Sequence, residues 1–116
     1  MQNNIKTGTI VTEETEVETK VVPPENCDVM LLNNALVSFE AVEDVLSEVL
    51  NIGRAKAMEI AITAHTRGRA SVFSGPKDVA EQYQRTLTDY ARAQHGEDTD
   101  GMGYDLLTFQ VVKKEV

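Results

Sequence analysis

The sequence predicts a single small α+β domain, in which a three-stranded antiparallel sheet carries three helices on one face. Two observations predict this class. Short apolar runs alternate with longer segments whose apolar residues recur every three or four positions. The expected order of elements is β-α-α-β-α-β, and a chain of 116 residues has room for one domain of this kind.

Residues 1–25 are polar and show no helical apolar stripe, because threonines interleave with glutamates along much of this stretch. So little apolar surface cannot offset the entropy lost on ordering the chain. We therefore predict a disordered N-terminal extension at residues 1–25 and a folded domain at residues 26–116. Alternating β-branched residues around Ile10 and Val17 leave an edge strand open as the alternative for the extension.

The first strand is predicted over residues 28–32, an apolar run that suits burial on both faces. Asn33 and Asn34 end this run, and Ser38 is a natural N-cap for a helix. We predict that helix over residues 39–50, because its apolar residues fall on one face. These residues are Val42, Val45, Leu46, Val49 and Leu50.

A second helix is predicted over residues 54–66, with Gly68 placed to end it in a left-handed conformation. The remaining elements follow in the order strand 70–73, a third helix with Pro76 as its first residue, a Gly/Asp loop at 95–104 and a strand at 106–112. The buried stripe expected on the third helix consists of Val79, Tyr83, Leu87 and Tyr90.

Composition excludes several classes of function. The net charge of −8 argues against a nucleic-acid partner and against an anionic membrane surface. No apolar run reaches the length of a membrane span, and the first residues lack the apolar core of a secretory signal. The single Cys27 excludes an internal disulfide and fits a reducing compartment, so we expect a cytoplasmic protein.

The candidate site combines Asn33 and Asn34 with His65, which lies on the apolar side of the second helix. These groups could stand at the mouth of an apolar pocket, a site that suits a ligand with a small polar head and an apolar tail. The alternative is structural: the two amides form a turn at the strand end, and the histidine packs near a helix C-terminus.

The sequence gives little support for a catalytic site, a metal site or a cofactor site. Cys27 and His65 could form a nucleophile and base, but nothing beside Cys27 indicates a lowered pKa, so a small buried side chain is favoured. Residues 98–101 lack the closing glutamate of a calcium loop, and no glycine-rich phosphate loop is present. We therefore predict a protein that is not an enzyme and that needs neither a metal nor another cofactor.

The combined pattern resembles the ClpS family, adaptors that deliver N-degron substrates, which are recognised by their first residue, to a ClpA-type AAA+ unfoldase of the Clp protease. The matching stretches are Pro23-Pro24, Met30–Asn34, Phe39–Leu46, His65–Ala70, Asp78–Glu81 and Tyr90–Arg92. The resemblance spans residues 23–94, resumes in the last strand, and implies the β-α-α-β-α-β fold.

The resemblance also implies roles for individual residues. In the family an Asn-Asp pair and a His hold the free α-amino group of the substrate, and Asn33, Asn34 and His65 occupy those positions. An apolar pocket takes the first side chain, and the corresponding residues here are Leu32, Val37, Phe39, Val42, Ala61, Ala64 and Leu106. The residues that would face the unfoldase are Leu36, Asp78 and Tyr83.

Several positions differ from the family's usual residues. Asn34 stands in place of an Asp, Leu36 in place of a Tyr, Phe39 in place of a Met that gates the pocket, and Tyr83 in place of a Lys. The expected function is an adaptor that binds N-degrons and passes them to the unfoldase. The alternative is a regulatory protein of the same fold that docks on the unfoldase without binding N-degrons.

Overall fold

A computed structural model describes residues 25–114. The helices and strands are β2 (Asn26–Leu32), α1 (Phe39–Leu50), α2 (Arg54–Arg67), β3 (Arg69–Pro76), α3 (Lys77–Gln94) and β4 (Phe109–Lys113). Two short 3-10 helices, η1 (Glu97–Thr99) and η2 (Tyr104–Leu106), lie between α3 and β4. The order confirms the predicted β-α-α-β-α-β fold class. The extension predicted at 1–25 lies outside the described residues, apart from Glu25.

The central strand β2 pairs antiparallel with both β3 and β4, so the strand order is β3-β2-β4. Cys27, Val29 and Leu31 alternate along β2 and are fully buried on one face. The intervening residues are only half-buried, so the prediction that this strand is buried on both faces is wrong. The helices cover one side of the sheet, which leaves the other side less protected.

The helix ends follow from local chemistry. The Ser38 hydroxyl accepts a hydrogen bond from the Ala41 N–H at 3.0 Å, which confirms Ser38 as the N-cap of α1. Gly68 ends α2 with a φ of 91°, a conformation that glycine adopts without steric cost. Pro76, however, is the last residue of β3 and precedes α3. The sheet holds it there, since it pairs with Asn26 and the next N–H, of Lys77, donates to Glu25 at 2.9 Å.

The start of β4 also differs from the prediction. The Leu106 N–H donates to the Gly103 carbonyl at 2.9 Å, and the Leu107 N–H donates to the Tyr104 carbonyl at 3.3 Å. These bonds close the 3-10 turn η2, so the strand begins at Phe109 instead of Leu106. The apolar pattern of residues 106–112 fits either a strand that begins at Leu106 or a turn followed by a strand. The turn alone therefore determines whether Leu106 or Leu107 faces inward.

The core is mostly aliphatic and lies between the sheet and the three helices. On α3 the fully buried residues are Ala80, Leu87 and Ala91, whereas the tyrosines of the predicted stripe are only half-buried. Small alanines allow α3 to approach the sheet closely, and the larger tyrosines fit only at its margin. None of the described helices is long and apolar enough to cross a membrane.

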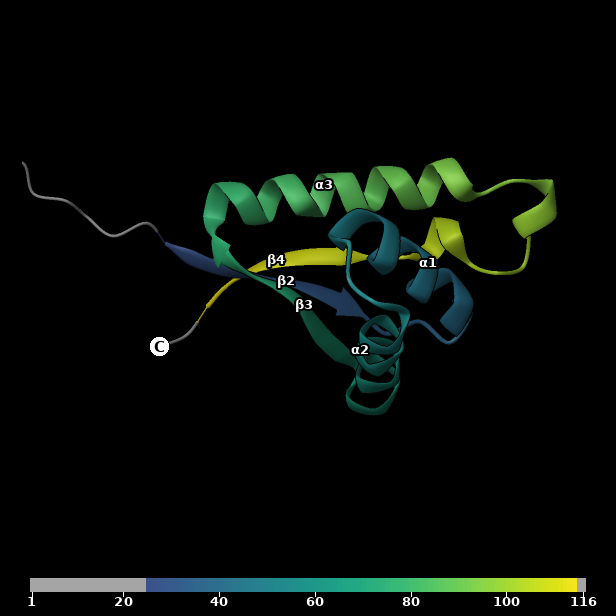
Figure 1. The fold of residues 1–116 in the computed structure, drawn as a ribbon, viewed down its shortest axis with the longest axis horizontal. Helices are drawn as coiled ribbons and strands as arrows, with labels where there is room; N and C mark the ends of the chain where they lie inside the picture. The colour runs from purple at the N-terminus through teal and green to yellow at the C-terminus, as the bar shows by residue number, and fades with distance from the viewer. Residues whose placement is uncertain (1–24, 115–116) are drawn as a thin grey trace, which may run out of the picture.

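Figure 1 shows how the fold creates a site at one end of the sheet. Helix α3 runs along the sheet and contacts all three strands, while α1 and α2 gather at the end toward which β2 points. The loop between β2 and α1, residues 33–38, therefore lies where the sheet meets α1 and α2. The segment between α3 and β4 reaches the same end of the molecule.

Candidate functional site

The loop at residues 33–38 is tied to its neighbours through its backbone. The Leu32 N–H donates to Thr108 at 3.1 Å, and the Asn33 N–H donates to Gly68 at 2.9 Å. Within the loop, the Asn34 carbonyl accepts from the Val37 N–H at 3.0 Å, and its side-chain Oδ1 accepts from the Leu36 N–H at 2.9 Å. Asn34 therefore builds a turn on its own backbone, as the structural alternative predicted.

The segment between α3 and β4 contacts this loop from outside, and we call its residues 102–104 the brace. The Met102 carbonyl accepts a hydrogen bond from the Ser38 N–H at 2.8 Å. Gly103 has a φ of 86°, and a Cβ at this position would lie 2.5 Å from the Leu36 oxygen and 2.6 Å from the Val37 Cα. Only glycine fits there. Sequence reasoning missed this contact, because Gly103 looked like one more residue of a Gly/Asp loop.

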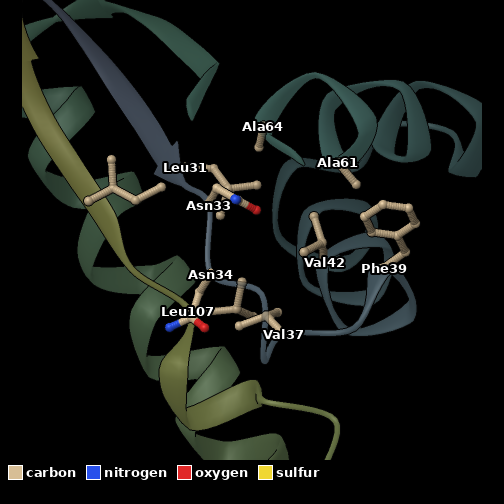
Figure 2. A pocket seen from close by; sticks show the side chains of 10 residues that line it. Leu31, Asn33, Asn34, Val37, Phe39, Val42, Ala61, Ala64 and Leu107 are labelled. Atoms are coloured by element: carbon tan, nitrogen blue, oxygen red, sulfur yellow. The ribbon is translucent and has the colours of Figure 1, made fainter. Parts of the chain in front are cut away.

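A pocket opens beside the loop, between the end of β2 and helices α1 and α2 (Figure 2). Its lining consists of Leu31, Leu32, Asn33, Asn34, Val37, Phe39, Val42, Ala61, Ala64 and Leu107. The structure thus brings together both amides and all but one of the apolar residues expected there. The free volume is about 20 Å³, enough for about one water molecule, so an apolar side chain enters only if the pocket widens.

The exception among the expected apolar residues is Leu106. The η2 turn directs Leu107 into the pocket and leaves Leu106 37% exposed, in a different hollow. Leu31 also lines the pocket, although it was expected only as part of a strand. Both differences occur at the end of the sheet, where residues 31–32 and 106–107 are pairs of adjacent leucines. The sequence does not show which leucine of each pair lines the pocket.

The two amides face different directions. Figure 2 shows the Asn33 side chain pointing toward α2 and the Asn34 side chain pointing away from it. Among residues 25–114 no group hydrogen-bonds to the Asn33 amide, whereas Asn34 already accepts one bond from its own loop. With respect to residues 25–114, both the oxygen and the amino group of the Asn33 side chain are therefore available to a ligand. Asn34 keeps its amino group and one oxygen lone pair.

Phe39 closes the side of the pocket next to α2, and its ring contacts His65 of that helix. Their ring centroids are 5.5 Å apart, and the ring planes meet at 81°, an edge-to-face contact. Phe39 lines the pocket and is 40% exposed, so its ring can swing outward without crossing the core. His65 is exposed and does not line the pocket itself; it lies behind Phe39.

The three residues expected to face the unfoldase do not form one patch. Leu36 is exposed in the loop after β2, while Asp78 and Tyr83 lie on the first turns of α3, at the other end of the sheet (Figure 1). Tyr83 packs on Phe73 of β3, with ring centroids 4.7 Å apart, so its ring is partly used by the fold. A partner that touches all three residues must span the length of β2.

The catalytic alternative is not supported by the arrangement of Cys27 and His65. Cys27 lies near the start of β2, opposite Gly75 and Lys113, whereas His65 is close to the other end of the sheet. Burial raises the pKa of the Cys27 thiol, which keeps it protonated and unreactive. In the part of the chain that the structure describes, no three His, Cys, Asp or Glu side chains come together as a metal site.

A carboxylate and two tyrosines anchor the brace to the helices. The Tyr104 hydroxyl donates to Asp44 at 2.8 Å, and the Tyr90 hydroxyl donates to the other Asp44 oxygen at 3.3 Å. Burial, together with the hydrogen bond to Asp44, raises the pKa of Tyr104 to about 12. Burial, and then the charge of Asp44, also raises the pKa of Tyr90. Both hydroxyls are therefore neutral donors at neutral pH.

The Tyr104 contact should make stability fall at high pH. The folded pKa of about 12 is above the ordinary value of 10, so the folded state binds the proton more tightly. This stabilisation is complete below pH 10 and disappears as the pH rises through 12; its upper limit is about 2.7 kcal/mol, less any screening by solvent. Urea unfolding at pH 9 and pH 11.5 should show this loss in wild type and a smaller loss in Tyr104→Phe. Equal losses in the two proteins would contradict the assignment.

Comparison with known proteins agrees with this geometry. Residues 22–99 match the family model described as ATP-dependent Clp protease adaptor protein ClpS, which is more than half of the chain. The chain belongs to the ClpS family. Over 73 residues it is 33% identical to the ClpS adapter protein of Hydrogenovibrio crunogenus and 26% identical to that of Neisseria gonorrhoeae; each match covers 63% of this chain and 70% of the relative.

A solved ClpS structure shares the fold. Agrobacterium tumefaciens ClpS2 bound to L-phenylalaninamide superimposes with a TM-score of 0.65 at 26% identity, covering 78% of this chain and 99% of that one. The family match ends at residue 99, whereas the brace at 102–104 lies beyond it. The brace and Leu107 of the pocket lining are therefore the parts of the site that lie outside the family match.

Proposed function

We propose that this protein binds the N-terminal residue of N-degron substrates and delivers them to a ClpA-type unfoldase of the Clp protease. The observation that carries the proposal is the pocket that joins two amides to an apolar lining at the end of β2. A substrate's free α-ammonium supplies three donors for oxygen acceptors, and its first side chain supplies the apolar tail. The bound phenylalaninamide of the ClpS2 neighbour has the same two parts.

In this proposal Asn33 is the principal amide acceptor for the ammonium, because its side chain has no hydrogen-bond partner among residues 25–114. Asn34 contributes its remaining lone pair while it holds the loop. His65 acts beside Phe39, and a ligand that moves the Phe39 ring also frees the imidazole ring that Phe39 contacts. The protein works as an adaptor in the cytoplasm and performs no chemistry itself.

A panel of peptides tests this proposal. Peptides that differ only in the first residue, Phe, Tyr, Trp, Leu, Val, Ile or Gly, should be titrated by calorimetry. We expect the aromatic residues and Leu to bind, and Gly, Val and Ile not to bind. If the protein binds the unfoldase but binds none of these peptides, the regulatory alternative is favoured, in which the protein docks without carrying a substrate.

Phe39 should act as the gate that sets this selectivity. Replacing Phe39 with Ala removes the ring that closes a pocket of about 20 Å³, so side chains excluded by shape gain access. We expect Phe39→Ala to bring the affinities for Val-initial and Ile-initial peptides to within about threefold of that for Leu, because the lost contacts are apolar and non-directional. A matched control is Ile62→Ala, an exposed apolar residue on α2 that does not line the pocket. Unchanged selectivity in Phe39→Ala would rule Phe39 out as the gate.

The N-terminal extension should serve delivery and not folding. Within residues 25–114 the buried core residues lie between Cys27 and Phe109, and the polar sequence of residues 1–22 offers little apolar surface to add to them. We expect the truncated protein to unfold at nearly the same temperature and to bind peptide equally well, but to lose assisted degradation of an N-degron substrate. A large drop in unfolding temperature would show instead that the extension is part of the fold.

A further inference from the structure

A second hollow lies on the outer side of the loop at residues 33–38, and we call it the outer hollow. It is formed by Leu36 from the loop and by residues between His95 and Leu106. Its volume is about 390 Å³, far larger than the free volume of the pocket. Asp100 and Asp105 are also part of its lining.

The outer hollow exposes apolar surface that the fold does not use. Leu36 is 71% exposed and Leu106 is 37% exposed, and both line this one hollow. Only two other large apolar side chains are exposed within residues 25–114, Phe39 and Ile62. Two exposed leucines that share a concave surface suit contact with an aliphatic chain.

The charge around these leucines is negative. Asp100 and Asp105 are both exposed, and the sequence has no Lys or Arg between Arg92 and Lys113. The only basic group in the lining is His95, whose Nδ1 lies 3.5 Å from an Asp105 oxygen. Nothing in the hollow carries a permanent positive charge, so its charge complements a cation.

The pocket and the outer hollow are separate, but residues of the same short loop, 33–38, line both of them. Asn34 lines the pocket, and its Oδ1 accepts the N–H of Leu36, which lines the outer hollow. Asn34 and Leu36 are two residues apart, so their Cα atoms are at most about 7 Å apart, the length that two residues of an extended peptide span. A peptide whose first residue fills the pocket beside Asn34 is therefore long enough to bring its second or third residue to Leu36.

We propose that the outer hollow is a subsite for a basic side chain, Lys or Arg, at the second or third position of the substrate. The aliphatic stem of such a side chain lies against Leu36 and Leu106, and its charged end pairs with Asp100 and Asp105. The inference rests on the proposed function, because the first residue must be held in the pocket. It adds selectivity for a substrate's following residues that the pocket alone does not provide.

The test compares peptides that begin with Phe and carry Lys, Gln or Glu at position two, and a second set varied at position three. In fluorescence-anisotropy titrations we expect the Lys peptide to bind about fivefold more tightly than the Gln peptide in at least one set. The Glu peptide should bind more weakly than the Gln peptide. The variant Asp100→Asn with Asp105→Asn should reduce the Lys/Gln ratio to below about twofold. The matched control, Glu97→Gln with Asp98→Asn, makes the same charge change in the same segment outside the hollow and should keep the ratio.

Each contrary outcome has a separate meaning. If Phe-initial peptides bind but Lys, Gln and Glu are equivalent, or if both double variants lower the ratio equally, the outer hollow is not the subsite. If the Asp100 and Asp105 changes weaken only unfoldase binding, the hollow is an unfoldase contact and the proposal is wrong. If no Phe-initial peptide binds at all, the proposed function is wrong as well. Methyl resonances of Leu36 and Leu106 in wild type should shift more with Lys than with Gln peptides, which tests the hollow even if a variant is unstable.

Discussion

Asn34→Asp should bind a Phe-initial peptide about ten times more tightly than the wild-type protein. A hydrogen bond to a charged group contributes about 1.5–3 kcal/mol, and an amide in place of a carboxylate gives up part of that contribution. Screening at the half-exposed rim of the pocket limits the difference to about 1.4 kcal/mol, which is tenfold in affinity. The aspartate can still accept the Leu36 N–H, so the substitution adds charge without removing the bond that shapes the loop.

The control for this substitution is Asn26→Asp, which adds the same charge at an exposed position at the opposite end of β2. It should leave peptide affinity within about twofold, because a charge beyond a Debye length is largely screened. His65→Ala should weaken binding in both the wild-type and the Asn34→Asp background. Equal gains from Asn26→Asp and Asn34→Asp would mean that net charge, and not an acceptor at the ammonium, controls the affinity.

Gly103→Ala should damage both stability and binding, although the residue lies outside the pocket. The added Cβ would meet the Leu36 oxygen at 2.5 Å and the Val37 Cα at 2.6 Å, and both are backbone atoms that cannot rotate away. The loop that carries Asn34 must therefore move. We expect peptide affinity to fall by more than tenfold and the free energy of unfolding to fall by about 2–4 kcal/mol, the range for strain combined with disrupted packing.

Gly101→Ala is the matched control, because Gly101 lies in the same segment with a φ of 91° but has no atoms within 4 Å of the added Cβ. It carries the same backbone cost, about 1 kcal/mol, without the collision. Urea unfolding and peptide titration of the two variants separate conformational strain from contact with the loop. If both variants bind peptide like wild type, the brace does not position the site.

The sequence was sufficient to predict the elements whose ends depend on local chemistry. Helix α1 has the predicted bounds, because Ser38 caps its start and its apolar residues repeat with helical spacing. The turn after α2 needs a left-handed residue, and Gly68 provides it. Periodicity and capping act over three to four residues, so a single sequence carries them directly.

Features that depend on contacts between distant segments could not be predicted in this way. Leu107 replaces Leu106 in the pocket because the η2 turn, held by the Gly103 and Tyr104 carbonyls, sets which leucine faces inward. The bond from Ser38 to Met102 joins two loops far apart in the sequence. The role of Asn34 in shaping its own loop was foreseen only as an alternative to ligand binding, and the structure makes these two roles compatible.

The central claim is that the pocket recognises a free α-amino group together with the side chain beside it. The most direct measurement is a fluorescence-anisotropy titration of one labelled Phe-initial peptide, with its amino group either free or acetylated, against the full-length protein. Acetylation leaves the aromatic side chain intact but removes the charge and two of the three N–H donors. We predict saturable binding of the free peptide and no measurable binding of the acetylated one. Equal binding of both peptides, or no binding of the free peptide at millimolar protein, would contradict the account.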